Sequence, residues 1–340
     1  MKRYLVIAVL PALLFMFLTA GAYQVQAAEK VINLKYQLCW SMMNKNSILQ
    51  EQWGKEIEKR TNGRVKFTYY PVGAIIPLGL IYDGIVKGLA DIGGGVLGYT
   101  RGRFPLTEVI DLPLGYNSGY QATLLINEYY KKFRPKEFDD AKVLYLSAHG
   151  PGLLWSKKPV NKLEDMKGLK VRSTGLSAKL VNALGGVPVG MPISEAYDAL
   201  SKGVADAIMV PAEAMAQWKL GEVVSYSIET YSTAYTSGFF VTMNKDKWNA
   251  LPPDIQKIFE AVSEEWIAKQ GRMWDEVDKD GNAFMTAKGA KVIKLSKEEE
   301  ARWAEKARPI LDEYAKSMKE KGLPGDEALK FCVDWLKAHP

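Results

Sequence analysis

The stretch MKGLKVRSTG, residues 166–175, places one arginine at the end of a short strand. Residues 169–172 alternate apolar and basic side chains, as strands do. Turn residues follow, and helical spacing then runs over residues 176–184 until Gly185-Gly186 ends it. In open α/β sheets, ligands bind at the carboxyl ends of the strands. Arg172 is therefore a candidate to hold a ligand carboxylate through paired charge-assisted hydrogen bonds, although its position alone favours a solvated surface arginine.

The first 27 residues predict a cleavable secretory signal peptide. Met1–Arg3 is basic, residues 5–18 are an apolar run, and Val25-Gln26-Ala27 supplies the small residues of a cleavage site. The mature chain is then expected to begin at Ala28. No cysteine lies at the cleavage point and no later run is apolar enough to span a bilayer, so we expect a soluble periplasmic protein without a membrane anchor.

Charge and length narrow the function classes. The chain has 340 residues and a net charge of +6, which becomes +4 when Lys2 and Arg3 leave with the signal peptide. Its charges are dispersed, and no basic stripe alternates with aromatic residues, so nucleic acid is not expected as a partner. About 313 mature residues exceed what one core usually supports, so two domains are expected.

Motifs for catalysis, metals or phosphate are missing from the sequence. His149 and His339 give neither zinc spacing nor a nucleophile-base couple, so we expect no metal, no cofactor and no enzyme activity. Gly93–Gly95 lacks phosphate-loop spacing and indicates close backbone approach instead. Cys39 and Cys332 lie at opposite ends of the chain and are either two buried thiols or, in an oxidising compartment, a disulfide.

The element pattern predicts an α/β protein with two similar lobes. A strand over residues 31–38, a helix over 48–60 and a strand over 65–70 form a unit typical of parallel sheets covered by helices. The sequence KGLADI at residues 87–92 is echoed by KGVADA at 202–207. In both, the glycine suits the left-handed position after a helix.

Two stretches are expected to cross between the lobes, and one helix to lean on both. Residues 149–152 are a glycine and proline cluster, and Tyr235–Met243 is a long apolar strand suited to the return. From Pro253, helical spacing continues for about thirty residues. We predict lobe I at residues 28–149 plus about 237–276, and lobe II at 150–236 plus about 277–340.

These pieces together resemble a solute-binding protein of the tripartite ATP-independent periplasmic (TRAP) transporters, the DctP-like family. The resemblance implies two α/β lobes with hinge strands and a long spanning helix, closing on an organic acid whose carboxylate Arg172 holds. It also implies membrane subunits of a TRAP transporter as partner. The segments that carry it are residues 165–172, 183–189, 191–200, 202–206, 243–245 and 248–252.

Three differences from the sialic-acid-binding branch of that family indicate an apolar pocket. Val210 replaces an asparagine, Val96 stands at an acidic position, and Gly152 falls near a second arginine position. A site without those polar groups would leave the hydroxyls of a polyol buried and unpaired. Glu213 is a candidate for a ligand ammonium or hydroxyl, or else a surface residue. Candidates for an apolar or aromatic wall, each with a core role as the alternative, are Trp40, Trp155, Trp218, Tyr235 and Phe239.

The sequence therefore predicts a monomeric periplasmic protein that captures a small monocarboxylate and delivers it to a TRAP transporter. The expected ligand is an aromatic or branched 2-oxo or 2-hydroxy acid, and a C4-dicarboxylate or another organic acid is the alternative. A ligand-dependent sensor that docks on a receptor is the rival reading of the same closing lobes.

Overall fold

The computed structural model describes residues 30–340, and the predicted signal peptide lies outside the described residues. The first of two sheets has the strand order β2-β1-β3-β10-β4. Strand β1 is parallel to both of its neighbours, whereas β10 is antiparallel to both of its own. The strands are β1 (Ile32–Gln37), β2 (Val65–Tyr70), β3 (Ile92–Val96), β4 (Ala141–Ala148) and β10 (Gly238–Asn244). We call the lobe built on this sheet lobe I.

The second sheet, which defines lobe II, has the order β11-β9-β5-β8-β6-β7. Strand β6 is parallel to β7 and β8, and β5 is antiparallel to β8 and β9. The strands are β5 (Leu153–Ser156), β6 (Lys170–Ser173), β7 (Val187–Gly190), β8 (Ala207–Val210), β9 (Tyr226–Glu229) and β11 (Lys291–Lys294). The strand predicted before Arg172 is therefore present and lies inside the second sheet.

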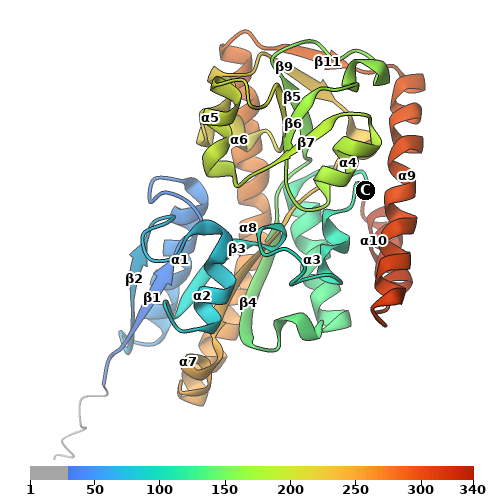
Figure 1. Ribbon diagram of the computed structural model, residues 1–340. Coiled ribbons are helices and arrows are strands. Elements are labelled where there is room, and N and C mark those ends of the chain that lie inside the picture. The colour runs from blue at the N-terminus through green and yellow to red at the C-terminus, as the bar shows by residue number, and fades with distance from the viewer. Residues whose placement is uncertain (1–29) are drawn as a thin grey trace, which may run out of the picture.

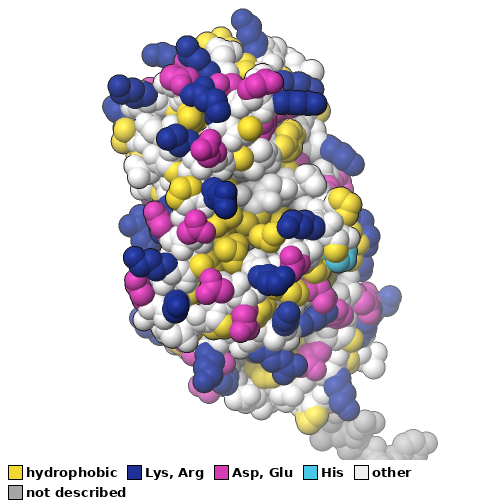
Figure 2. Space-filling model, turned by 90° about the vertical axis from the view of Figure 1, so that its right-hand side faces the viewer, with side chains coloured by type: hydrophobic (Ala, Val, Ile, Leu, Met, Phe, Trp, Pro, Cys, Tyr) yellow, Lys and Arg dark blue, Asp and Glu magenta, His cyan; other side chains and the backbone are white. Residues whose placement is uncertain are grey.

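Helices cover both sheets (Figure 1). They are α1 (Lys45–Arg60), α2 (Ile81–Val86), α3 (Gly119–Phe133), α4 (Ser177–Ala183), α5 (Ala196–Ser201), α6 (Glu213–Gln217), α7 (Lys245–Asn249), α8 (Pro253–Ala287), α9 (Lys297–Glu320) and α10 (Gly325–Ala338). Between residues 30 and 340, none is long and apolar enough to cross a bilayer. On the face shown in Figure 2, basic and acidic side chains are interspersed around a smaller apolar area.

Helix α8 spans the two lobes, as predicted, and has 35 residues. It packs against α1, α3 and β4 in lobe I and against α6 in lobe II (Figure 1). Gly281 makes the second contact possible, since a Cβ there would lie 1.9 Å from the carbonyl oxygen of Ala212. The predicted boundaries place α10 in lobe II, yet α10 packs against α3 of lobe I. The lobe boundaries given above therefore stay a prediction.

The strand predicted to begin at Tyr235 begins later in the structure. Strand β10 begins only at Gly238, and Tyr235 instead forms an isolated antiparallel bridge with Gly152. The Gly152 N–H donates to the Tyr235 carbonyl at 2.7 Å. A Cβ on Gly152 would lie 2.2 Å from the Tyr235 ring, so this position has no room for a side chain. The chain therefore crosses between the lobes twice at this point, and the segment around Gly152 lies beside the segment around Tyr235.

The glycines flagged in the sequence have the expected structural roles. Gly88 and Gly203, in the two echoed segments, have φ of 75° and 76°. A Cβ on Gly93 would lie 2.7 Å from Ile85, and one on Gly95 would lie 2.4 Å from Phe240. The glycines of β3 thus allow helix α2 and strand β10 to approach the backbone closely, which confirms the prediction of close packing.

Candidate ligand-binding site

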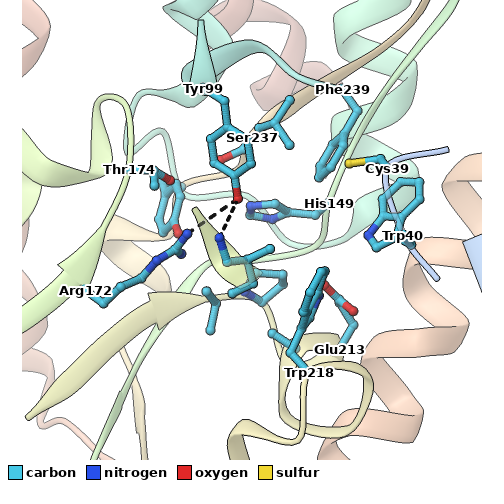
Figure 3. Close-up of a pocket in the computed structure, with 16 residues that line it drawn as sticks. Cys39, Trp40, Tyr99, His149, Arg172, Thr174, Glu213, Trp218, Ser237 and Phe239 are labelled. Atoms are coloured by element: carbon cyan, nitrogen blue, oxygen red, sulfur yellow. Dashed lines mark hydrogen bonds between the residues drawn. The ribbon is translucent and has the colours of Figure 1, made fainter. Parts of the chain in front are cut away.

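A cavity lies between the lobes, where several strands of both sheets end (Figure 3). It contains about 500 Å³ of empty space, its open mouth included. Its walls come from the segments that follow β1, β3, β4 and β8, from β6, and from the start of β10. The lining residues are Cys39, Trp40, Val96, Tyr99, His149, Arg172, Thr174, Ile193, Val210, Pro211, Glu213, Ala214, Trp218, Tyr235, Ser237 and Phe239. The chain thus forms its cavity at the carboxyl ends of strands, as open α/β sheets do.

Arg172 lies on β6 and is only 2% exposed, so it is not a solvated surface residue. Its Nε and Nη2 donate to the carbonyl oxygen of Met191 at 3.1 and 2.8 Å. That carbonyl therefore fixes one edge of the guanidinium, and Nη1 has no hydrogen-bond acceptor among residues 30–340. No described carboxylate pairs with Arg172 either. A buried cation without an anionic partner is costly, so this side chain is poised for an anion from outside the chain.

Tyr99, in the 3-10 turn after β3, brings a lobe I side chain to the same place. Its hydroxyl accepts from the Ile193 N–H at 3.1 Å and lies 3.5 Å from Arg172 Nη2 (Figure 3). Both contacts cross from lobe I to lobe II. Since the hydroxyl accepts in both, its own hydrogen stays available for a ligand oxygen near Arg172. Tyr99 could not be predicted from the sequence pattern, because its partners come from the other lobe.

Aromatic rings form the wall of the cavity near β1 and β10. The Trp40 and Phe239 rings stack with centroids 5.5 Å apart, and Phe239 lies 5.0 Å from the buried Trp274 ring behind it. Half-buried Trp218 contributes a face from the segment after α6. The Tyr235 ring also lines the cavity. Its hydroxyl donates to the Met209 carbonyl at 2.8 Å. The structure thus brings four of the five predicted aromatic side chains together.

Trp155, the fifth, is not among the cavity residues. Its side chain is 1% exposed in the core of lobe II, and its Nε1 donates to the Val210 carbonyl at 3.1 Å. Side chains alternate between the two faces of a strand, and this one points away from the cavity. Trp155 is therefore a support for the backbone at Val210. Val210 and Val96 themselves line the cavity and add apolar surface to it.

Glu213 is buried in the cavity wall, not on the surface, and is 6% exposed. Its backbone N–H donates to Asp278 Oδ1 at 2.8 Å, but its carboxyl Oε2 has no described partner. Burial, with the negative charge of Asp278 nearby, raises the pKa of Glu213 to about 8. The carboxyl is therefore held largely as a neutral acid at pH 7, which makes it a hydrogen-bond donor.

His149 is a lining residue that the sequence offered only as an unassigned histidine. It follows β4 directly and is 5% exposed. Burial, with the positive charge of Arg172 nearby, lowers the pKa of His149 to about 4. The imidazole is therefore neutral at pH 7, and Arg172 is the one cationic side chain that lines this cavity within residues 30–340.

The two cysteines are buried free thiols, so the disulfide alternative is excluded in this structure. Cys39 lies beside Trp40 in the cavity wall, whereas Cys332 is in α10 (Figure 3). Burial raises the pKa of both thiols above its usual range. Neither thiol is thus available as a thiolate nucleophile or metal ligand near neutral pH.

Comparison with known proteins identifies the family of this two-lobed cleft. Residues 43–317 match the family described as bacterial extracellular solute-binding protein, family 7, or DctP. The chain belongs to this family. A DctP relative from Nostoc sp., named monocarboxylate 2-oxoacid-binding periplasmic protein, is 26% identical over 287 residues, which cover 81% of this chain and 77% of the relative.

Solved structures of TRAP solute-binding proteins share the fold. One from Rhodoferax ferrireducens, in complex with copurified benzoate, is 29% identical with a TM-score of 0.85, covering 91% of this chain and 98% of that one. A marine metagenome protein specific for aromatic acid ligands, in complex with 3-hydroxybenzoate, is 27% identical with a TM-score of 0.85, covering 91% and 99%. The two-lobed α/β fold predicted for this DctP protein is confirmed.

Proposed function

We propose that this DctP protein captures an aromatic or branched monocarboxylate in the periplasm and delivers it to the membrane subunits of a TRAP transporter. Arg172 anchors the carboxylate, Tyr99 donates a further hydrogen bond to it, and the wall formed by Trp40, Trp218 and Phe239 receives the tail. Binding closes the lobes, because the anchor belongs to lobe II and Tyr99 to lobe I.

The observation that carries this proposal is the state of the Arg172 guanidinium. It is buried, one edge is fixed by the Met191 carbonyl, and no carboxylate of the described chain neutralises it. A carboxylate meeting the remaining edge restores both charge balance and hydrogen bonding, a pairing worth about 1.5–3 kcal/mol. The benzoate and 3-hydroxybenzoate bound to the structural neighbours are acids of this kind.

The charge of the cavity favours one carboxylate over two. A second carboxylate would find no other lysine or arginine among the lining residues of the described chain. Burying such an unpaired anion costs several kcal/mol. A polyol would likewise leave hydroxyls unpaired against Val96 and Val210. An apolar tail instead gains from contact with the aromatic wall.

A ligand panel on two variants tests the proposal. Purified protein is titrated calorimetrically with benzoate, phenylacetate, a branched 2-oxo acid, C4-dicarboxylates and sialic acid, after a thermal-shift screen of the same acids. A ligand at 100 times its Kd should add about 2.7 kcal/mol of stability. We expect an aromatic or branched monocarboxylate to bind best, and Arg172→Gln to weaken it roughly 10- to 100-fold because the charge-assisted pair is lost.

Lys170→Gln is the matched control, since Lys170 is an exposed cation on the same strand. It should leave affinity unchanged. Preference for a dicarboxylate or a sugar acid would show that the argument from the apolar wall is wrong. Equal affinity in Arg172→Gln and wild type would remove Arg172 as the anchor.

A further inference from the structure

The ring of His149 is held in one orientation inside the cavity wall. The edges of three aromatic rings surround it, with centroids 5.6 Å away for Tyr235, 6.2 Å for Phe239 and 6.3 Å for Trp274. The backbone is fixed as well, because the Thr236 hydroxyl donates to the His149 carbonyl at 2.6 Å. The ring therefore has little freedom to turn, and its two nitrogens face different surroundings.

Hydrogen bonding decides which nitrogen carries the proton. Nδ1 lies 2.6 Å from the Gly150 carbonyl oxygen, which can only accept, so Nδ1 must be the donor. The Thr236 hydroxyl, 3.4 Å from Nδ1, has already given its hydrogen to the His149 carbonyl. In a neutral imidazole, protonation of Nδ1 leaves a lone pair on Nε2. The lowered pKa of His149 keeps the ring in this neutral form.

Nε2 is an acceptor without a partner. No residue between 30 and 340 forms a hydrogen bond with it, although the side chain is more than nine-tenths buried. Figure 3 shows the ring centrally among the labelled lining residues, with Tyr99 and Phe239 on one side and Trp218 and Glu213 on the other. Nε2 borders the open space of the cavity, so a donor on a ligand can reach it and supply the hydrogen bond that the described chain does not.

We propose that His149 determines specificity: its Nε2 accepts a hydrogen bond from a hydroxyl or amino group carried by the ligand in addition to the carboxylate held by Arg172. The preferred ligand class is then a hydroxy- or amino-substituted aromatic monocarboxylate. This inference rests on the proposed function, since it assumes that an aromatic acid occupies the cavity. It adds a second polar contact to a site otherwise lined by apolar groups.

A matched ligand series isolates that contact on the unmodified protein. Calorimetric titrations compare benzoate with its 2-, 3- and 4-hydroxy, amino and methoxy derivatives, and phenylacetate with mandelate and 3-hydroxyphenylacetate. A methoxy oxygen fills the same space but has no hydrogen to donate. We expect at least one hydroxy or amino acid to bind about 3- to 10-fold more tightly than its parent, as one net hydrogen bond provides, and the matching methoxy acid to lose that gain.

Two variants assign the gain to a side chain. His149→Phe keeps a ring in place but removes Nε2, so the ratio of parent to hydroxy-acid Kd should fall to about one. Glu213→Met removes the polar group on the other side of the cavity and should retain the ratio. The inference is overturned if methoxy and hydroxy acids bind alike, if His149→Phe retains the ratio, or if Glu213→Met alone abolishes it.

Failure of the proposed function looks different. If neither parent acid nor any derivative binds wild type, the aromatic ligand class is wrong and the inference about His149 falls with it. If the parent acids bind but substituents add nothing, the proposed function stands and only the role of His149 is lost. Should His149→Phe fail to fold, the comparison of hydroxy with methoxy acids on wild type still decides.

Discussion

Arg172 and Tyr99 show how single residues couple anchoring to closure. The arginine comes from β6 of lobe II, and the tyrosine from the turn after β3 of lobe I, yet their polar groups lie 3.5 Å apart. The Tyr99 hydroxyl also accepts from the Ile193 N–H in lobe II. A ligand carboxylate placed here meets donors from both lobes, so its affinity depends on the lobes being together.

Removing the Tyr99 hydroxyl should weaken both the contact between the lobes and the binding of the ligand. In Tyr99→Phe, the Ile193 N–H loses its acceptor and the ligand loses a donor, and each net hydrogen bond is worth about 1 kcal/mol. We expect Kd for the best monocarboxylate to rise roughly 5- to 30-fold in calorimetry. Tyr120→Phe, a change on helix α3 away from the cavity, is the control. An unchanged Kd in Tyr99→Phe would show that this hydroxyl contributes nothing to binding.

Glu213 should make stability depend on pH. Its pKa is raised from 4.5 to about 8 in the fold, so the folded protein keeps a proton that the unfolded chain releases above about pH 4.5. The stabilisation is complete below pH 4.5 and is lost as pH rises through about 8, with a slope of up to about 1.4 kcal/mol per pH unit. Glu213→Gln should therefore gain stability relative to wild type as pH increases from 5 to 8.

Urea unfolding followed by tryptophan fluorescence at pH 5, 6, 7 and 8 measures this difference. Asp278, whose pKa burial raises to about 7, and the Cys39 thiol face Glu213 and remain in both proteins. Subtracting the two curves therefore gives the titration of Glu213 together with any change that its removal makes to Asp278. Glu195→Gln, the same change at an exposed glutamate, is the control variant. A flat difference for Glu213→Gln would mean that its carboxyl ionises normally in the fold.

At the scale of elements, strand β3 depends on having no side chains where its neighbours approach. A Cβ on Gly95 would lie 2.4 Å from the Phe240 ring of β10, whereas one on Gly94 would meet only the end of the Gln50 side chain at 3.2 Å. The ring is held among Tyr82 and Phe104, with centroids at 5.3 and 6.0 Å, and has no room to move. The glutamine amide is the more adaptable neighbour.

Gly95→Ala should therefore destabilise the protein by about 1–3 kcal/mol, the usual effect of overpacking a core. Gly94→Ala, one residue away on the same strand, should cost less than half as much. Urea unfolding at one pH compares the two variants. Equal losses would show that β3 tolerates a methyl group on either face and that the approach of Phe240 does not require glycine.

Sequence patterns predicted elements best where one period ran long or one residue type was required. Helix α8 kept its 3.6-residue spacing over 35 residues, and Gly88 and Gly203 took the left-handed backbone expected of them. Trp155 could not be placed by pattern, because a short apolar strand in a buried sheet does not show which face meets the cavity. Glu213, Tyr99 and His149 could not be placed by pattern either, since their burial or partners come from residues far along the chain.

At the scale of the whole molecule, the lobes meet through glycine as well as through Tyr99. A Cβ on Gly98 of lobe I would lie 3.4 Å from the Cα of Gly175 in lobe II and 3.4 Å from Asp111 Oδ2. The two backbones therefore touch almost directly beside the cavity. Any side chain longer than a methyl group at this point would hold them apart.

Gly98→Val should act as a wedge. We expect it to fold normally but to bind the best monocarboxylate at least tenfold more weakly, since Arg172 and Tyr99 can no longer reach the ligand together. Small-angle scattering with saturating ligand should give a larger radius of gyration than wild type. Gly79→Val, where no atom lies within 4 Å of the added Cβ, is the control. Full closure and full affinity in Gly98→Val would show that the glycine contact does not limit closure.

The Arg172 guanidinium has no carboxylate partner among residues 30–340, and this bears on how a membrane transporter could recognise the protein. Closing the lobes without a ligand would remove this cation from water, and such burial costs several kcal/mol. If this protein carries an acid as proposed, its empty form is therefore expected to favour open lobes and its loaded form closed lobes. A transporter that binds only the closed form would then use its ion gradient for loaded protein and not for empty protein. It could make this distinction without contacting the acid itself.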